Sequence, residues 1–201
     1  MNVIHSRWLA LRTSAARTQD GFTLVEILVA IVVLSFGILG VVGMQAAALQ
    51  SNRSARNQSI AVALGRELGD MMRGNKGVAL ATSSTDNPYL IANYTGTAPE
   101  ITVNCFTGAC ASAKAVAQYD MDQWLARVKA ALPQARVVVC FDDTPYGSTG
   151  QPQWACNSAA NQTLVVKIGW TQQGLQASDA AIKASDGLPG VVLPLIAGSS
   201  T

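Results

Sequence analysis

Hydrophobic residues are concentrated in one long segment near the N-terminus. Residues 22–52 carry a single charged side chain, Glu26, and the string FTLVEILVAIVVLSFGILGVVGM is long enough to cross a bilayer as a helix, which needs about 20 apolar residues. Further along, apolar positions recur every three or four residues, which predicts that the helix continues with one apolar face: Ile60, Leu64, Leu68 and Met71. We therefore expect a helix over residues 22–73, about 78 Å long, with its transmembrane half at 22–44.

The rest of the chain, residues 74–201, predicts a small domain of mixed structure. Gly74, Asn75 and Gly77 supply a stop signal for the first helix, and a second helix is expected from Tyr119 to Leu132, with Asp120 and Asp122 at its start. Alternating or continuous apolar runs predict strands at residues 89–92, 100–104, 135–141, 163–171 and 191–193. The expected fold class is α+β, a long N-terminal membrane-spanning helix packed on a small antiparallel β-sheet domain.

The distribution of charge orients the chain in a membrane and narrows its function. After residue 21 the chain carries 11 of its 14 basic residues and 11 of its 12 acidic residues, and these charges balance. The net charge of +2 therefore belongs to residues 1–21. The positive-inside bias then keeps residues 1–21 in the cytoplasm and places residues 74–201 in the periplasm. A neutral domain argues against nucleic-acid binding. The single histidine, His5, lies in the leader, which disfavours an enzyme, and we expect no cofactor.

Two features of the apolar segment leave alternatives open. A cleavable signal peptide with a site near Ala46 is one reading, although its apolar region of about 7–15 residues would be shorter than this segment. Glu26 costs on the order of 2–3 kcal/mol within a membrane span, so it is a functional candidate; the alternative is that its carboxylate reaches the interface.

The string GFTLVEILVAIVVLSFGILG, residues 21–40, resembles the type III leader of type IV pilins and related pseudopilins. The resemblance implies that residues 1–21 are a leader peptide, that a prepilin peptidase cleaves after Gly21, and that the new N-terminal residue, Phe22, is N-methylated. It also implies that Glu26 of one subunit pairs with the Phe22 amine of a neighbour during filament assembly. Two poorly solvated charges attract far more strongly than they would in water.

Two later segments resemble the minor pilin family called PilV, the type IV pilus modification proteins: MQAAALQSNRSARNQSIAVALGRELGDMMRGNK and AVAQYDMDQWLARVKAALPQARVVVC. This resemblance implies a non-enzymatic subunit that primes pilus assembly and thereby supports twitching motility and surface attachment. The implied partners are other minor pilins, the major pilin, the inner-membrane assembly platform and a tip adhesin. The implied location is the inner membrane, as a single-pass protein with a periplasmic domain, and then the pilus fibre or tip.

The four cysteines, Cys105, Cys110, Cys140 and Cys156, all follow the apolar segment, so the expected topology places them in the periplasm, where disulfides persist. Three pairings are possible, and we favour Cys105–Cys110, which closes a small loop, with Cys140–Cys156, which ties a strand to the end of a glycine- and proline-rich connection. A four-thiolate zinc site is the alternative, but no C-x-x-C element is present and no metal is expected.

Other functional classes have weaker support. A minor pseudopilin of a type II secretion system would share every N-terminal feature, a DNA-uptake pilin would need a basic stripe, and a membrane-anchored periplasmic enzyme would need a catalytic constellation. The adjacent acids Asp142 and Asp143 are better explained as turn residues. Three tryptophans are expected in the core or at an interface: Trp124, Trp154 and Trp170.

Overall fold

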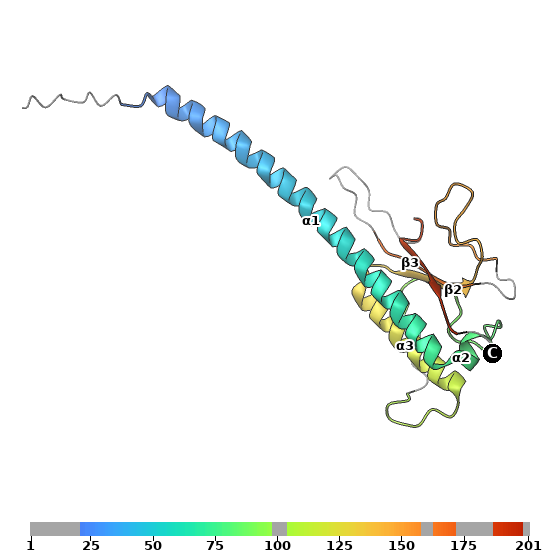
Figure 1. The fold of residues 1–201 in the computed structure, drawn as a ribbon. Coiled ribbons are helices and arrows are strands. Elements are labelled where there is room, and N and C mark those ends of the chain that lie inside the picture. The colour runs from blue at the N-terminus through green and yellow to red at the C-terminus, as the bar shows by residue number, and fades with distance from the viewer. Residues whose placement is uncertain (1–20, 98–103, 158–162, 172–186, 199–201) are drawn as a thin grey trace, which may run out of the picture. The chain divides into compact units, whose positions relative to one another are not determined.

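The computed structural model describes residues 21–97, 104–157, 163–171 and 187–198 (Figure 1). Its elements in chain order are helices α1 (Leu24–Gly74) and α2 (Lys76–Ala79), strand β1 (Ile91–Tyr94), helix α3 (Ala113–Ala131), and strands β2 (Arg136–Phe141), β3 (Leu164–Gly169) and β4 (Val191–Leu195). The strands form one antiparallel sheet in the order β1-β2-β3-β4. The expected α+β class is confirmed. The chain divides into two compact units, residues 1–44 and 45–201, which are described separately.

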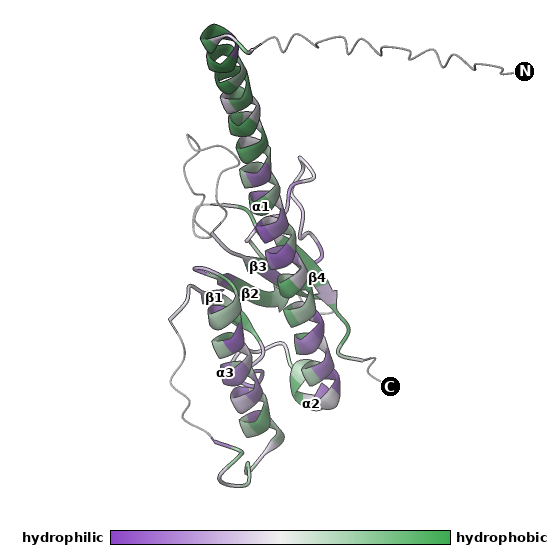
Figure 2. Ribbon diagram, turned by 90° about the vertical axis from the view of Figure 1, so that its left-hand side faces the viewer, coloured by the Kyte–Doolittle hydropathy of each residue, from purple (hydrophilic) through white to green (hydrophobic). Residues whose placement is uncertain are grey.

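The first unit contains the N-terminal part of α1, which Figure 2 shows as predominantly hydrophobic and in which Glu26 is the charged residue. An 18-residue window of α1 is long and apolar enough to cross a membrane, and none of that window is buried within the protein. The hydroxyl of Ser35 donates to the carbonyl oxygen of Ile31 at 2.7 Å, so this polar group is satisfied within the helix itself. The segment therefore presents an apolar surface without a partner inside the described chain.

In the second unit, the C-terminal part of α1 packs through the predicted apolar stripe. Leu64, Leu68 and Met72 are buried at spacings of four residues. Gly65 lies between them and against the sheet: a Cβ atom built on it would lie 2.5 Å from Cδ1 of Leu193 in β4. The absence of a side chain at residue 65 thus allows the helix to approach the strand closely.

Helix α3 begins six residues before the expected start. The hydroxyl of Ser112 accepts a hydrogen bond from the N–H of Ala115 at 3.1 Å, which makes Ser112 the N-cap. The prediction that Asp120 and Asp122 lie at the start of this helix was therefore wrong, because both lie in its interior. Trp124 is fully buried on the core side of α3, and its indole N–H donates to the carbonyl oxygen of Leu64 at 2.9 Å.

The helix stop signal after α1 is only partly confirmed. Helix α1 ends at Gly74, but after Asn75 a further short turn of helix follows, α2, which contains Gly77. Strand β1 starts two residues later than expected because Asn87 organises a turn before it: its side-chain oxygen accepts from the N–H of Tyr89 at 3.1 Å. The strand expected at 100–104 lies, apart from its last residue, outside the described residues.

The two edges of the sheet are short or interrupted. In β1, Ile91 lies opposite Val139 of β2 and Tyr94 lies opposite Val137. Three residue steps along β1 therefore match two along β2, so the register shifts between these pairs. Strand β4 extends two residues beyond its expected end and includes Pro194, opposite Val165. A proline has no N–H to donate to a neighbouring strand on either side.

The central strands β2 and β3 carry apolar residues on both faces. One face contributes to the main core beneath α1 and α3, through Val137, Val139, Val166 and Ile168. The opposite face is formed by Val138, Cys140, Val165 and Lys167, and we call it the outer face of the sheet. Since Trp154 and Cys156 pack on this outer face, both sides of the two central strands are covered.

Candidate functional sites

The expected processing site lies just before helix α1. Gly21, Phe22 and Thr23 are not helical, and the Phe22 side chain is 78% exposed. The peptide bond between Gly21 and Phe22 therefore lies in an exposed, non-helical segment. Cleavage at this bond stays a prediction.

Thr23 caps helix α1, a feature that the sequence reasoning missed. Its hydroxyl accepts from the N–H of Glu26 at 3.3 Å, and its carbonyl oxygen accepts from the N–H groups of Glu26 and Ile27 at 3.1 and 3.3 Å. The order Thr-x-x-Glu is the signature of a capping box and could have revealed the helix start. Glu26 lies in the first turn, where the helix dipole favours a negative charge.

The apolar surface that follows Glu26 is the largest exposed hydrophobic feature among the described residues. Every large hydrophobic side chain in the range 24–44 is at least 45% exposed. Soluble monomers rarely expose contiguous apolar patches of more than a few hundred Å², so this surface requires lipid or other protein chains around it.

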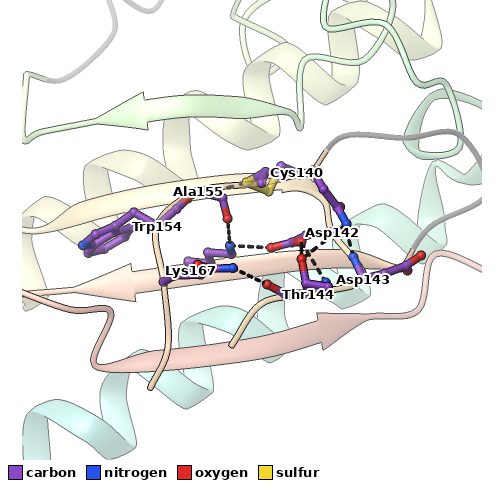
Figure 3. A network of polar contacts seen from close by, with 10 residues as sticks. Cys140, Asp142, Asp143, Thr144, Trp154, Ala155 and Lys167 are labelled. Atoms are coloured by element: carbon purple, nitrogen blue, oxygen red, sulfur yellow. Dashed lines mark hydrogen bonds and ion pairs between the residues drawn. A yellow bond between two sulfur atoms is a disulfide. The ribbon is translucent and has the colours of Figure 1, made fainter. Parts of the chain in front are cut away.

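A second candidate site lies on the outer face of the sheet, around Lys167 (Figure 3). The side chains of Lys167 and Asp142 are both 0% exposed, and Nζ of Lys167 lies 2.5 Å from Oδ2 of Asp142. The same ammonium group donates to the carbonyl oxygen of Ala155 at 2.5 Å. The buried charge therefore has two acceptors, one in the residue after β2 and one in the segment that crosses the outer face.

Asp142 is held as a carboxylate by its neighbours. Burial alone would raise the pKa of its carboxyl group, but the hydrogen bond and charge of Lys167 and backbone hydrogen bonds at Thr144 and Asn157 lower that pKa overall. The N–H of Thr144 donates to Oδ1 at 2.9 Å, which is the turn role expected for Asp142. Sequence reasoning missed the ion pair, for which the available signal was a lysine inside the apolar strand TLVVKIGWT.

The neighbouring acid, Asp143, differs from Asp142 in exposure. It is exposed, and its Oδ1 accepts from the N–H of Thr163 at 3.1 Å, so it also has the expected turn role. Its own N–H donates to the side-chain oxygen of Asn157 at 3.2 Å. Through these contacts Asp143, near the end of β2, is linked to Thr163, just before β3, and to Asn157 in the connection between the two strands.

The four cysteines form two disulfides, Cys105–Cys110 and Cys140–Cys156, which are the pairs that we favoured. The side-chain ligand atoms of Cys140, Cys156 and Asp142 lie within 4.8 Å of one another, a spacing compatible with a metal. The sulfur atoms are bonded to each other, however, and no free cysteine remains to supply a thiolate. Since Lys167 also faces Asp142, these residues do not fit a cation site.

Trp154 covers the outer face next to this cluster. Its indole N–H donates to the carbonyl oxygen of Gly187 at 2.7 Å, and the guanidinium carbon of Arg136 lies 4.3 Å from the ring centroid. The other two described tryptophans, Trp124 and Trp170, are buried in the main core, as expected. Beside Trp154 is a groove of about 410 Å³ without charged lining residues, and its lining includes Leu90, Ala92, Trp154, Ala155 and Cys156.

Asp122 is a buried acid with an incomplete set of partners. It is 2% exposed, Nε2 of Gln118 donates to its Oδ1 at 3.1 Å, and its Oδ2 has no hydrogen-bond partner among the described residues. Burial raises the pKa of this carboxyl group, and the hydrogen bond from Gln118 opposes the shift. Asp122 therefore opposes folding at neutral pH, unlike Asp142.

Comparison with known families supports the N-terminal site. Residues 16–42 match the family model described as the prokaryotic N-terminal methylation motif. No curated protein and no solved structure matches the chain. The matched range includes Gly21, Phe22 and Glu26, and it covers the first part of the exposed apolar helix.

The matched motif and the fold point to the same class of protein. A prepilin-like methylation motif, a long apolar N-terminal helix and a small antiparallel sheet are the features of type IV pilins and pseudopilins, and proteins with this motif are structural. The motif implies processing by a prepilin peptidase and assembly with pilus-type partners, and the apolar helix indicates membrane anchoring.

Proposed function

We propose that this chain is a minor pilin of a type IV pilus, of the PilV kind, which helps to prime filament assembly and thereby supports twitching motility and attachment. The methylation motif at residues 16–42, which includes the first part of an unburied apolar helix, is the observation that carries this proposal. The similarity of residues 44–76 and 115–140 to PilV, noted in the sequence, is the reason for choosing a minor pilin within the class.

Each segment of the chain has its own role in this proposal. Residues 1–21 are the leader, residues 22–73 form the helix with its transmembrane half at 22–44, and residues 74–201 form the periplasmic domain with two disulfides. The prepilin peptidase cleaves after Gly21 and methylates Phe22. The apolar helix then holds the subunit in the inner membrane until the assembly platform transfers it to the filament core, where lipid is replaced by neighbouring helices.

Glu26 has the assembly role in this proposal. Cleavage leaves a charged amine on Phe22 next to hydrocarbon, and a carboxylate from another subunit neutralises it in a medium where the attraction is strong. Other minor pilins, the major pilin and a tip adhesin are the proposed partners. The disulfide-bonded domain, which shows no catalytic constellation among its described residues, selects among them.

The first test is the N-terminus of the mature protein, measured by mass spectrometry of membranes from cells with and without the prepilin peptidase. The expected result is an N-methylated Phe22 that disappears without the peptidase. A start near residues 45–50 would indicate a cleaved signal peptide, and an intact Met1 would indicate a simple membrane anchor; either result contradicts the proposal.

The second test is deletion of the chain in its native host. Loss of surface pili and of twitching, restored by the full chain, is expected of a minor pilin. Normal pili with a defect in protein secretion would instead assign the chain to a type II secretion system as a pseudopilin.

A further inference from the structure

One ammonium group contacts both ends of the loop that a disulfide closes. We call residues 141–155, between Cys140 and Cys156, the clasp loop. Asp142, which accepts from Lys167, follows Cys140 by two residues, and Ala155, whose carbonyl oxygen accepts from the same Nζ, directly precedes Cys156. Figure 3 shows these three residues beside the disulfide. The noncovalent contact thus closes almost the same loop as the sulfur–sulfur bond.

Closing this loop carries an entropic cost whichever bond does it. The two cysteines are 16 residues apart, and joining the ends of a loop of this length costs conformational entropy. If Lys167 already holds Asp142 and Ala155, this cost is met before the sulfur atoms react. Formation of the disulfide then becomes a reaction between two sulfur atoms that are already neighbours, at a high effective concentration.

The location of Lys167 makes the contact obligatory. It occupies the middle of β3, where the side chain is 0% exposed and every residue of the strand is buried. An ammonium group in such a place is strongly unfavourable unless it is paired and hydrogen-bonded. Folding of β3 beside β2 therefore selects clasp-loop conformations that bring both Asp142 and Ala155 to Lys167. An apolar residue at the same place would not impose this selection.

From this arrangement we propose that Lys167 is a positioning residue for oxidative pairing of Cys140 with Cys156. Its ammonium group brings the two ends of the clasp loop together before the disulfide forms, and the disulfide then locks the loop on the outer face of the sheet. This role goes beyond the proposed assembly function, because it concerns how the domain matures and applies to a pilin or a pseudopilin alike.

The oxidation itself requires an external disulfide, here a dithiol–disulfide oxidant of the periplasm or, in vitro, oxidised glutathione. Cys156, which is more exposed than Cys140, attacks the oxidant as a thiolate and releases one oxidant sulfur as a thiolate. The Cys140 thiolate then attacks Sγ of Cys156 and releases the second oxidant sulfur. One disulfide forms and one is reduced, and the two cysteine protons pass to the two oxidant sulfurs.

The clasp loop also builds a surface. Trp154, Ala155 and Cys156 contribute to the lining of the uncharged groove, and so does Cys140, the other half of the disulfide. Locking of the clasp loop by Lys167 and then by the disulfide therefore fixes this part of the lining.

The test is reoxidation of the full-length chain in detergent micelles. Reduced protein is placed in glutathione buffers of graded redox ratio, and each disulfide is quantified separately by differential alkylation and peptide mass spectrometry. Lys167→Met is expected to lower the effective concentration for the Cys140–Cys156 pair by about tenfold or more, because hydrogen bonds to charged groups are lost. The local pair, Cys105–Cys110, is expected to stay unchanged, as is either pair in Lys129→Met, which removes an exposed lysine.

A core variant separates positioning from general stability. Leu68→Ala weakens the main core without touching the clasp loop, and it is compared with Lys167→Met at a temperature where the two reduced proteins are folded to the same extent. A larger loss of Cys140–Cys156 pairing in Lys167→Met supports the proposal. An equal loss in both variants, or no loss in Lys167→Met, overturns it.

A second pair of variants serves if Lys167→Met does not fold. Asp142→Asn removes the charge that faces Lys167 but keeps the size of the side chain, whereas Asp143→Asn changes the exposed neighbouring acid. Slower pairing of Cys140 with Cys156 in Asp142→Asn alone supports the proposal. Equal rates in the two variants contradict it.

Discussion

Trp124 in α3 donates its indole N–H to the carbonyl oxygen of Leu64 in α1 at 2.9 Å, in a fully buried setting. The contact joins residues 60 positions apart and fixes the depth at which α3 lies against α1. The carbonyl oxygen of Leu64 lies within helix α1, where it accepts a helical backbone hydrogen bond. Because a carbonyl oxygen has two lone pairs, it can also accept the bond from Trp124.

The first prediction concerns this bond. Trp124→Phe keeps an aromatic ring but loses the donor and part of the buried volume, so we expect a loss of about 1–3 kcal/mol in the free energy of unfolding. The measurement is denaturant unfolding of the full chain in detergent, followed by circular dichroism. Tyr146→Phe, at a half-exposed loop position, is the control and is expected to change little. An equal effect of the two substitutions would contradict a special role of the indole.

A second prediction compares two glycines one helical turn apart in α1. A side chain at Gly65 meets Leu193 at 2.5 Å, whereas a Cβ at Gly69 meets Leu195 at 3.6 Å, an ordinary contact. Gly65→Leu should therefore overpack the interface with β4 and cost about 1–3 kcal/mol, while Gly69→Ala should be neutral or stabilise the helix by up to about 1 kcal/mol. Thermal unfolding of both variants decides the matter, and equal midpoints would mean that α1 does not pack on β4 this closely.

The third prediction concerns the pH dependence of stability through Asp142. Its folded-state pKa is lowered, so the stability that it contributes is present at neutral pH and is lost as the pH falls through that lowered value, below about pH 4. Asp142→Asn leaves Lys167 buried without a counter-charge and should cost about 3–5 kcal/mol at pH 7. Thermal midpoints from pH 7 to pH 3 test this; a midpoint at pH 7 equal to that of the unsubstituted protein would exclude a contribution from the ion pair.

Asp122 is expected to behave in the opposite way. Its folded-state pKa is raised, so the charged form opposes folding at neutral pH and the penalty disappears as the pH falls through the raised value. Asp122→Asn should therefore raise the thermal midpoint at pH 7, and its advantage should shrink in acid. A lower midpoint at pH 7 would show that the buried carboxylate has a stabilising partner.

The last prediction concerns Glu26. Glu26→Gln keeps the size of the side chain and the Thr23 cap, whose donor is a backbone N–H, so membrane insertion and methylation of Phe22 should persist. Filament incorporation should fall, because a neutral amide cannot neutralise the N-terminal amine of a neighbour. Cell fractionation and mass spectrometry measure the first two properties, and immunodetection in sheared pili measures the third. Normal incorporation of the variant would remove Glu26 from the assembly mechanism.

The elements predicted best from the sequence are those with an unambiguous apolar pattern. Helix α1 was expected at 22–73 and is observed at Leu24–Gly74, because a long uncharged run followed by an amphipathic stripe leaves few alternatives. Strands β2 and β3 were located for the same reason, since branched apolar residues fill them. The start of helix α3 was predicted too late because its first turns are rich in alanine and contain a single larger apolar residue, Val116. The signal for the start lay in the N-cap, Ser112, rather than in periodicity.

The candidate sites differ in how far the sequence predicts them. The predicted processing and assembly residues, Gly21, Phe22 and Glu26, lie close together in the chain and form a motif, so they could be proposed without a structure. The cluster around Lys167 could not, because its partners are an acid 25 residues away and a backbone carbonyl oxygen, and a carbonyl group has no sequence signature. The burial of Lys167 follows only from the register of β2 and β3 and from the path of the clasp loop over them.

The interrupted edges of the sheet have a consequence for the life of the subunit before assembly. Strand β4 carries Pro194, and β1 is four residues long with a shifted register, so neither edge offers a long, regular row of backbone groups to another chain. In the proposed function, membrane-anchored copies lie close to one another before assembly, where long regular strand edges would pair between chains. The interrupted edges oppose such pairing, so the proposed subunits stay separate until they are assembled.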